Sequence, residues 1–319
     1  MQTGRMRAAE ADVVASELGQ PVTDVRSLAG GFSHETCLVE LGTDRVVVRL
    51  GGTDPAIEAA VMDAARGHVP VPDVLRVRPA ADGVSRPVMI LEFVDGTPLS
   101  HVLASDGAGD RASMTDLGAV TGQAFGGVAA VTFNGPGFFT SQDLAVGDMP
   151  PWSEQLPGMA VNCMAGTPDS RLDSDAKRAW IGLCTRHAPA LASVDNQARL
   201  VHADANPKNV LVTRAGDGWR VDAVLDWEFS FSGSPYADYA NMTRFAGTYP
   251  DGFTDGFRAG FAARLTGELA GELDEDWAYL GRVMDMFALS DLVTRPEGHP
   301  VADEAAGEIR RWITSGVPA

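Results

Sequence analysis

Lysine is the residue that this chain most lacks, since only Lys177 and Lys208 occur among its 25 basic side chains. Cysteine is also scarce: three cysteines lie far apart with no C-x-x-C pair, which predicts neither a zinc site nor a disulfide framework. No apolar run approaches membrane-spanning length, and residues 1–10 contain no apolar signal segment. We therefore expect a cytoplasmic protein with no membrane partner.

Positive charge as a whole is in deficit. The chain has 43 acidic and 25 basic side chains and a formal net charge of −18, which argues against nucleic acid or anionic lipid as a partner. The deficit is uneven, because residues 93–319 carry 30 acidic and 16 basic side chains whereas residues 1–92 carry 13 and 9. An acidic surface on the C-terminal part would attract a cationic ligand. The alternative explanation is that the acidic residues serve only to keep the protein soluble.

The most informative stretch runs from Leu200 to Val212, followed by a second acidic turn at Asp226. An apolar run leads to His202 and Asp204, and Asn209 begins another apolar run. A tight loop between two short strands can point Asp204 and Asn209 into one cleft. A hairpin that turns in the glycines at 216–218 then returns the chain to Asp226, 17 residues after Asn209.

These three residues have the chemistry that phosphoryl transfer requires. One carboxylate orients a hydroxyl group, while an amide and a second carboxylate hold Mg²⁺. Aspartate and asparagine in loops are otherwise turn formers or helix caps. The spacing H-x-D-x4-N between two apolar runs favours a site over that alternative.

Three oxygen-bearing side chains in this order resemble the aminoglycoside phosphotransferase family, small-molecule relatives of protein kinases that include choline-kinase-like enzymes. The resemblance extends from Leu28 to about Trp312 and implies an α+β, two-lobed, protein-kinase-like fold. Residues 1–93 would form a small antiparallel sheet with one long helix and bind the nucleotide phosphates. Residues 94–319 would form a mainly helical lobe with the catalytic loop, the metal site and the acceptor site.

The resemblance also implies roles for individual residues. Asp204 orients the acceptor hydroxyl, and Asn209 and Asp226 hold Mg²⁺. His202 braces the catalytic loop without taking part in the chemistry. Asp238 supports the same loop by hydrogen bonds, and the alternative for it is an exposed carboxylate at a helix start.

The absence of a lysine from the first half of the chain bears on phosphate binding. A kinase-like N-lobe uses a strand lysine there, and Arg49, at the end of the predicted strand 45–50, is the candidate substitute. A solvent-exposed arginine on an edge strand is the alternative.

Asp54 and the proline after it predict the start of a helix over 54–66. Glu58 in its first turn would pair with Arg49, or would only complement the helix dipole.

Two backbone segments complete the predicted nucleotide site. Gly30, Gly31 and Ser33 lie in a glycine turn whose amides can approach phosphates. The run 88–99 predicts a last N-lobe strand that passes into a linker. The backbone groups between Glu92 and Val94 can bind a purine edge there, a contact that does not separate ATP from GTP.

The rest of the chain has helical periodicity. We expect helices over residues 114–130, 175–192, 254–266 and 276–294. From Pro250 onward two helices are predicted, and the second carries Asp285 and Asp291. These carboxylates are candidates for binding acceptor ammonium groups, although a solvated helix face is the favoured explanation.

The predicted function is transfer of the γ-phosphoryl group of ATP or GTP to a hydroxyl of a small molecule, with Mg²⁺ as cofactor. The acidic C-terminal part favours a cationic antibiotic, an aminoglycoside or a basic cyclic peptide, and hence a role in resistance. One alternative is a metabolic kinase for an amino alcohol or a sugar. Another is a nucleotide-binding pseudokinase, against which the presence of Asp204, Asn209 and Asp226 together argues.

Overall fold

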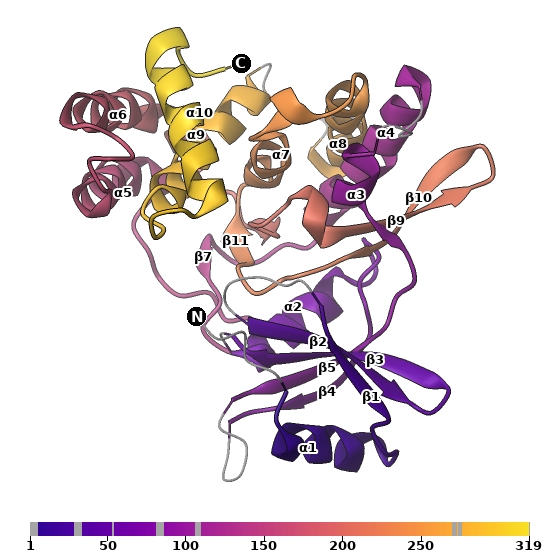
Figure 1. Cartoon of the computed structure of the whole chain (residues 1–319). Coiled ribbons are helices and arrows are strands. Elements are labelled where there is room, and N and C mark those ends of the chain that lie inside the picture. The colour runs from indigo at the N-terminus through magenta and orange to yellow at the C-terminus, as the bar shows by residue number, and fades with distance from the viewer. Residues whose placement is uncertain are drawn as a thin grey trace.

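The chain folds into an antiparallel sheet followed by a largely helical part (Figure 1). The structure is a computed structural model that describes residues 6–28, 34–52, 54–80, 86–105, 110–269, 273 and 276–318. The α+β architecture expected from the sequence is present. No helix in the described part of the chain has the length and apolarity needed to cross a bilayer.

The N-terminal sheet has five antiparallel strands in the order β1-β2-β3-β5-β4. They are β1 (Asp24–Ser27), β2 (His34–Leu41), β3 (Asp44–Gly51), β4 (Val74–Arg78) and β5 (Val88–Glu92). Side chains alternate between the two faces of β3. Val46, Val48 and Leu50 pack in one apolar cluster with Val14, so Arg49 points to the opposite face.

One helix covers each face of this sheet (Figure 1). Helix α2 (Pro55–Ala65) begins as predicted, because the Asp54 carboxylate accepts the Ala56 N–H at 2.9 Å. Its buried residues Val61 and Met62 join the large core of the molecule. Helix α1 (Ala8–Leu18) packs on the other face. The expectation of one helix in this part is therefore wrong.

Within the residues that the structure describes, the C-terminal part contains eight α-helices: α3 (Leu99–Leu103), α4 (Arg111–Val128), α5 (Trp152–Gly166), α6 (Ser174–His187), α7 (Tyr236–Thr243), α8 (Phe253–Leu269), α9 (Trp277–Leu292) and α10 (Pro300–Ser315). Three short 3₁₀ helices also occur: η1 (Ala188–Ser193), η2 (Pro207–Asn209) and η3 (Ala246–Thr248). The four predicted helices correspond to α4, α6 with η1, α8 and α9. The expectation of two helices after Pro250 is wrong, since α10 buries Ile309 and Trp312 against the core.

Two small sheets face the N-terminal part. One has the order β10-β9-β6, from β6 (Thr97–Pro98), β9 (Val210–Ala215) and β10 (Gly218–Val224). The other has the order β7-β11-β8, from β7 (Gly137–Phe138), β8 (Arg199–Val201) and β11 (Phe231–Gly233). The expected division at residue 93 falls between β5 and β6, and its status as a domain boundary stays a prediction.

Helices α4 and α8 pack with their backbones in contact. A Cβ atom at Gly118 would lie 2.1 Å from the Phe253 carbonyl oxygen, and one at Gly260 would lie 2.1 Å from that of Ala119. Such distances are sterically forbidden, so glycine is needed for this approach. The pair also contacts the residue that follows β8, because Phe125 of α4 packs edge-on against His202 with ring centroids 5.7 Å apart.

Candidate active site

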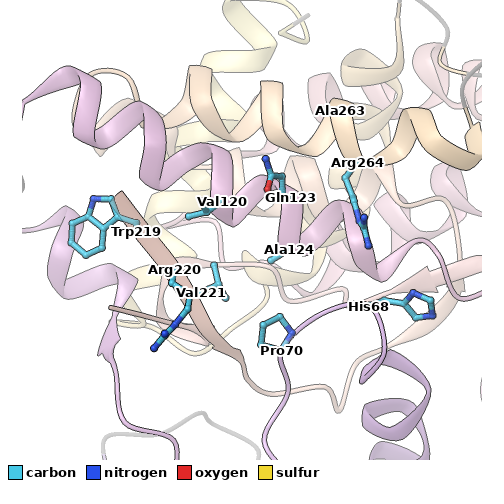
Figure 2. A pocket seen from close by; sticks show the side chains of 10 residues that line it. All are labelled: His68, Pro70, Val120, Gln123, Ala124, Trp219, Arg220, Val221, Ala263 and Arg264. Carbon is cyan, nitrogen blue, oxygen red and sulfur yellow. The ribbon is translucent and has the colours of Figure 1, made fainter. Parts of the chain in front are cut away.

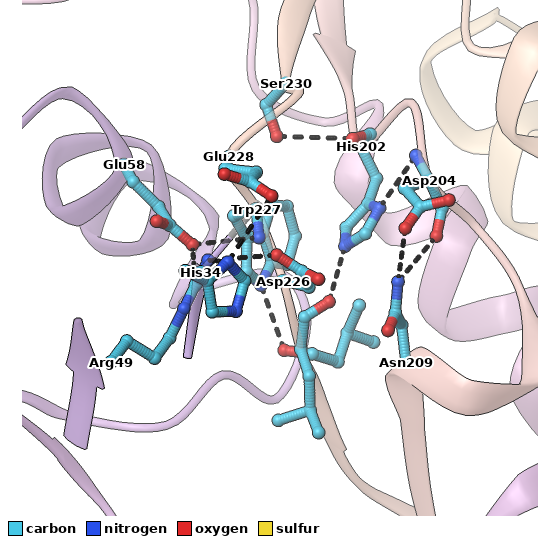
Figure 3. A network of polar contacts seen from close by, with 12 residues as sticks. His34, Arg49, Glu58, His202, Asp204, Asn209, Asp226, Trp227, Glu228 and Ser230 are labelled. Carbon is cyan, nitrogen blue, oxygen red and sulfur yellow. Dashed lines mark hydrogen bonds and ion pairs between the residues drawn. The ribbon is translucent and has the colours of Figure 1, made fainter. Parts of the chain in front are cut away.

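The loop between β8 and β9 holds the first carboxylate of the site. Asp204 Oδ2 accepts the Asn209 side-chain N–H at 2.8 Å (Figure 3). Its Oδ1 accepts the Asn206 side-chain N–H at 3.0 Å. Burial and the charge of Asp226 raise the pKa of Asp204 to about 6, against the opposing effect of these hydrogen bonds. A carboxylate with a fixed orientation and a raised pKa is suited to orient or accept a proton.

His202 ties this loop to the one that carries Asp226. Its Nδ1 accepts the Asp204 backbone N–H at 3.2 Å, so Nε2 carries the proton and donates to the Leu225 carbonyl oxygen at 2.9 Å. The ring is fully buried, and burial lowers its pKa to about 4. His202 is thus neutral, and its hydrogen bonds connect the two loops; that it takes no part in the chemistry, as the resemblance implies, stays a prediction.

Asp238 supports the backbone just before Asp204. Its carboxylate accepts the N–H of His202 at 2.9 Å and that of Ala203 at 2.8 Å. Ala203 has a φ of 68°, in the left-handed region that residues with a Cβ rarely adopt. Burial raises the pKa of Asp238 to about 7. The two hydrogen bonds offset the backbone strain, which typically costs about 1–3 kcal/mol.

Asp226 lies two residues after the end of β10 and also has a positive φ, of 66°. Arg49 Nη2 donates to its Oδ1 at 3.0 Å, and Arg49 Nη1 bonds Glu58 (Figure 3). Glu58 in turn accepts the Trp227 N–H at 3.1 Å. The pairing of Arg49 with Glu58 is therefore present, and β3 is a central strand, so the edge-strand alternative is wrong. One arginine fork joins the N-terminal sheet, α2 and the Asp226 turn.

The sequence reasoning missed two further members of this cluster. His34 Nδ1 lies 2.9 Å from Arg49 Nη2 and 3.5 Å from Glu228 Oε1. Ligand atoms of His34, Asp226 and Glu228 all lie within 4.8 Å of one another. The proximity of Glu228 to Asp226 in the sequence is a signal for its presence here, whereas His34 has no local signal. Burial raises the pKa of both Glu58 and Asp226, with the Arg49 charge opposing it.

Oxygen atoms suited to a divalent cation occur at this point. The Asn209 amide nitrogen is engaged with Asp204, which leaves its carbonyl oxygen for a ligand. The Leu225 N–H donates to the Asn209 backbone oxygen at 2.8 Å and so holds Asn209 beside the Asp226 turn. Amide and carboxylate oxygens are ligands that Mg²⁺ prefers, and the donor set fits that ion.

The other residues predicted for the nucleotide site are Glu92, Val94, Gly30, Gly31 and Ser33. The Glu92 N–H already donates to the Asp73 carbonyl oxygen at 2.8 Å, so it is not free for a purine. Within the part of the chain that the structure describes, nothing hydrogen-bonds to the backbone of Val94. Gly30, Gly31 and Ser33 lie outside the described residues.

The two acidic residues proposed for the acceptor do not form a surface pair. Asp285 is fully buried and bonds Arg244 Nε at 3.0 Å and the Asn241 amide at 3.2 Å. Both explanations offered for Asp285, an exposed ammonium ligand and a solvated face, are wrong, because α7 packs over this face of α9. Asp291 is partly exposed and pairs with Arg295, four residues along the chain, at 2.9 Å.

A separate cavity of about 440 Å³ lies between α4, α8, β10 and the segment after α2 (Figure 2). Its lining includes His68, Gln123, Trp219 and Arg264, and none of the predicted site residues. This cavity is therefore separate from the candidate site at Asp204 and Asp226.

The comparisons with known proteins concern the family and the fold. A family model described as phosphotransferase enzyme family matches residues 24–278. The crystal structure of aminoglycoside phosphotransferase APH(4)-Ia matches with a TM-score of 0.70 and 19% identity, covering 97% of this chain and 99% of that one. The GDP and kanamycin complex of APH(2")-IIIa matches with a TM-score of 0.68 and 16% identity, covering 96% and 98%.

A provisionally assigned fructosamine-3-kinase from Thermobifida fusca has a TM-score of 0.61 and 17% identity, covering 97% of this chain and 100% of that one. These likenesses confirm the predicted protein-kinase-like fold. No curated protein sequence matches significantly.

Proposed function

This chain belongs to the phosphotransferase enzyme family, and on that premise we propose that it transfers the γ-phosphoryl group of ATP or GTP to a hydroxyl group of a cationic small molecule. The observation that carries the proposal is the Asp204 carboxylate, which the amides of Asn206 and Asn209 fix in the loop beside the Asp226 turn. A similar protein, APH(4)-Ia, is described in a ternary complex with ADP and hygromycin B.

Each polar group then has a role. Asp204 orients the acceptor hydroxyl and accepts its proton. Asn209 and Asp226 would hold Mg²⁺, and this ion would supply positive charge that neutralises the transferred phosphoryl group. Arg49 clamps the nucleotide phosphates, and Glu58 positions Arg49. Because the transition state is loose, positioning and charge neutralisation supply most of the rate enhancement.

Net charge supports a cationic acceptor. Residues 93–319 have an excess of acidic over basic side chains, 30 against 16, which attracts a polycation by long-range electrostatics. Aminoglycosides and basic cyclic peptides have this character, and their phosphorylation would confer resistance. A metabolic kinase for an amino alcohol or a sugar is the second candidate, favoured by the structural likeness to the provisionally assigned fructosamine-3-kinase.

The test is a nucleotide-consumption screen with ATP and GTP against hygromycin B, kanamycin, a fructosamine and an amino alcohol. With the best acceptor, Asp204→Ala should lower kcat on the order of 10²–10⁴-fold while nucleotide still binds. Asp217→Ala, at the exposed turn between β9 and β10, is the matched control and should keep full activity. Near-normal turnover in the Asp204 variant would remove this residue from the mechanism.

A further inference from the structure

The cavity of about 440 Å³ between α4, α8, β10 and the segment after α2 has a lining that differs in charge from the chain as a whole (Figure 2). The chain has 43 acidic and 25 basic side chains. Among the described residues, nevertheless, those that line the cavity include no aspartate or glutamate, whereas they include His68, Arg220 and Arg264. A concave site with positive charge and no carboxylate favours a negatively charged ligand.

Three polar side chains of the lining are available to a ligand. Arg220 is not among them, because its Nε donates to Asp222 Oδ1 of the same strand at 2.7 Å. The side chains of His68, Gln123 and Arg264, in contrast, have no hydrogen-bond or ion-pair partner among the residues that the structure describes. Imidazole, amide and guanidinium groups can all donate hydrogen bonds to an anion.

These donors lie close to one another. Gln123 and Gly127 are four residues apart on α4 and therefore share one face of the helix. A Cβ atom at Gly127 would lie 3.5 Å from Arg264 Nε and 2.6 Å from the His68 carbonyl oxygen. The Arg264 guanidinium thus lies beside the segment that carries His68, one helical turn from Gln123 (Figure 2).

The rest of the cavity is mostly apolar. Figure 2 shows Trp219 at the end far from Arg264, and the residues between these two ends include Pro70, Val120, Ala124 and Val221. The indole N–H of Trp219 already donates to Ser113 Oγ at 3.0 Å, so this end offers an apolar ring. A ligand that fills the cavity therefore needs an anionic group at one end and an apolar part beside it.

The walls of the cavity are held together by hydrogen bonds within the protein. The Trp219 backbone N–H donates to Asp116 Oδ2 at 2.9 Å and joins β10 to α4. The Val224 N–H donates to the Pro70 carbonyl oxygen at 2.9 Å and joins β10 to the segment after α2. The cavity thus exists before a ligand enters it, which keeps the entropic cost of binding small.

We infer that this cavity binds a small organic anion, with its phosphate or carboxylate group at His68, Gln123 and Arg264 and its apolar part between α4 and β10. The inference goes beyond the proposed function, because the lining contains none of the residues assigned to phosphoryl transfer. A neutral or cationic molecule gains no ion pair with Arg264. An ion without an apolar part leaves the remaining lining in water.

The test is calorimetry with ligands that share a phenyl ring: phenyl phosphate, phenylacetate and the neutral benzyl alcohol. Inorganic phosphate and acetate are the counterparts without the ring. Mg²⁺ and AMP-PNP are present, so that the candidate nucleotide site is occupied, and the titrations are repeated without them. The preferred anion should bind roughly ten-fold or more tightly than benzyl alcohol, and roughly ten-fold more tightly than its counterpart without the ring. Either order of the two aromatic anions supports the inference and identifies the anionic group.

Two variants place the ligand in the cavity. Gln123→Glu keeps the size of the side chain and adds a negative charge, and Arg264→Gln removes a positive one. Each should weaken binding of the preferred anion on the order of ten-fold or more. Arg258→Gln is the matched control, because Arg258 is an exposed arginine of the same helix that does not line the cavity. It should leave the affinity unchanged.

Several results would overturn the inference. They are the absence of binding by either aromatic anion, binding of benzyl alcohol as tight as that of the anions, and equal losses in the Arg258 and Arg264 variants. Inorganic phosphate or acetate that binds as tightly as its aromatic relative would reveal an adventitious ion only. Loss of anion binding on addition of Mg²⁺ and AMP-PNP would place the probe in the nucleotide site. The proposed function is read separately, from the dependence of phosphoryl transfer on Asp204, so either can fail without the other.

Discussion

Replacing Arg49 by methionine tests the polar cluster that joins the two parts of the molecule. Methionine keeps most of the side-chain length and removes the charge. The substitution deletes two charge-assisted hydrogen bonds, from Nη1 to Glu58 and from Nη2 to Asp226. The carboxylates of Glu58 and Asp226, with that of Glu228 close by, then lie buried without the positive charge of Arg49.

The magnitude follows from these contacts. Hydrogen bonds to charged groups contribute roughly 1.5–3 kcal/mol each. Breaking a buried ion pair from one side costs about 3–5 kcal/mol. We therefore expect the free energy of unfolding of Arg49→Met to fall by about 3–5 kcal/mol near pH 8.

The loss should depend on pH in a defined direction. Burial already raises the pKa of Glu58 and Asp226, and removing the arginine raises both further. A carboxyl group whose pKa is raised in the folded state holds its proton there, so the penalty is small near pH 5. The penalty grows as the pH rises through the raised pKa.

The assay is urea unfolding at pH 5 and pH 8 without nucleotide or Mg²⁺. Arg45→Met is the matched control, because Arg45 lies on the same strand and its ion pair with Asp95 at 3.2 Å is exposed. Exposed pairs contribute less than about 1 kcal/mol. Equal losses in the two variants, or a loss in Arg49→Met that is the same at both pH values, would refute the reasoning.

Three further predictions concern metal, charge and acid stability. Mg²⁺ should bind the nucleotide-free protein weakly and the nucleotide complex tightly in calorimetry, because Asn209 and Asp226 supply too few oxygens for an octahedron; tight binding without nucleotide would contradict the site. The KM for a cationic acceptor such as kanamycin should rise steeply with salt while the KM for the nucleotide changes little, since exposed charges are screened over ~8 Å at physiological ionic strength. An acceptor KM that does not change with salt concentration would point to a neutral acceptor. Burial lowers the pKa of His202 to about 4, so the unfolded chain takes up a proton that the folded protein does not, and the free energy of unfolding should fall by about 3 kcal/mol between pH 6.5 and pH 4. In urea unfolding, the free energy of unfolding of His202→Gln should depend less on pH over this range; an equal dependence in the two proteins would mean that the ring titrates normally.

Local patterns were enough to predict much of the site. The spacing of Asp204 and Asn209 between two apolar runs predicted a strand, a loop and a strand, because short apolar runs form strands and polar residues between them favour a loop; the two strands, β8 and β9, lie in different sheets. The predicted strand 45–50 and the predicted helix start at Asp54 are the segments that carry Arg49 and Glu58. Each of these signals lies within a few residues of the group that it positions.

The sequence alone was less informative about helices. Helix α1 was missed because it buries little apolar surface beyond Val14. Helix α10 has a readable stripe that ends at Trp312, and its omission was an error of interpretation.

Only the tertiary structure decided which distant groups meet. His34 and Glu228 join Arg49 because β2 pairs with β3 and the Asp226 turn packs beneath that sheet, contacts that no local pattern encodes. Asp285 has the spacing of a surface residue, yet it is buried because Arg244, 41 residues away, comes to lie opposite it when α7 packs on α9. A sequence determines which side chains an element presents, because that follows from the period of a helix or strand. Their partners depend on how the elements pack, since a buried charge is stable only where another part of the chain supplies its counter-charge.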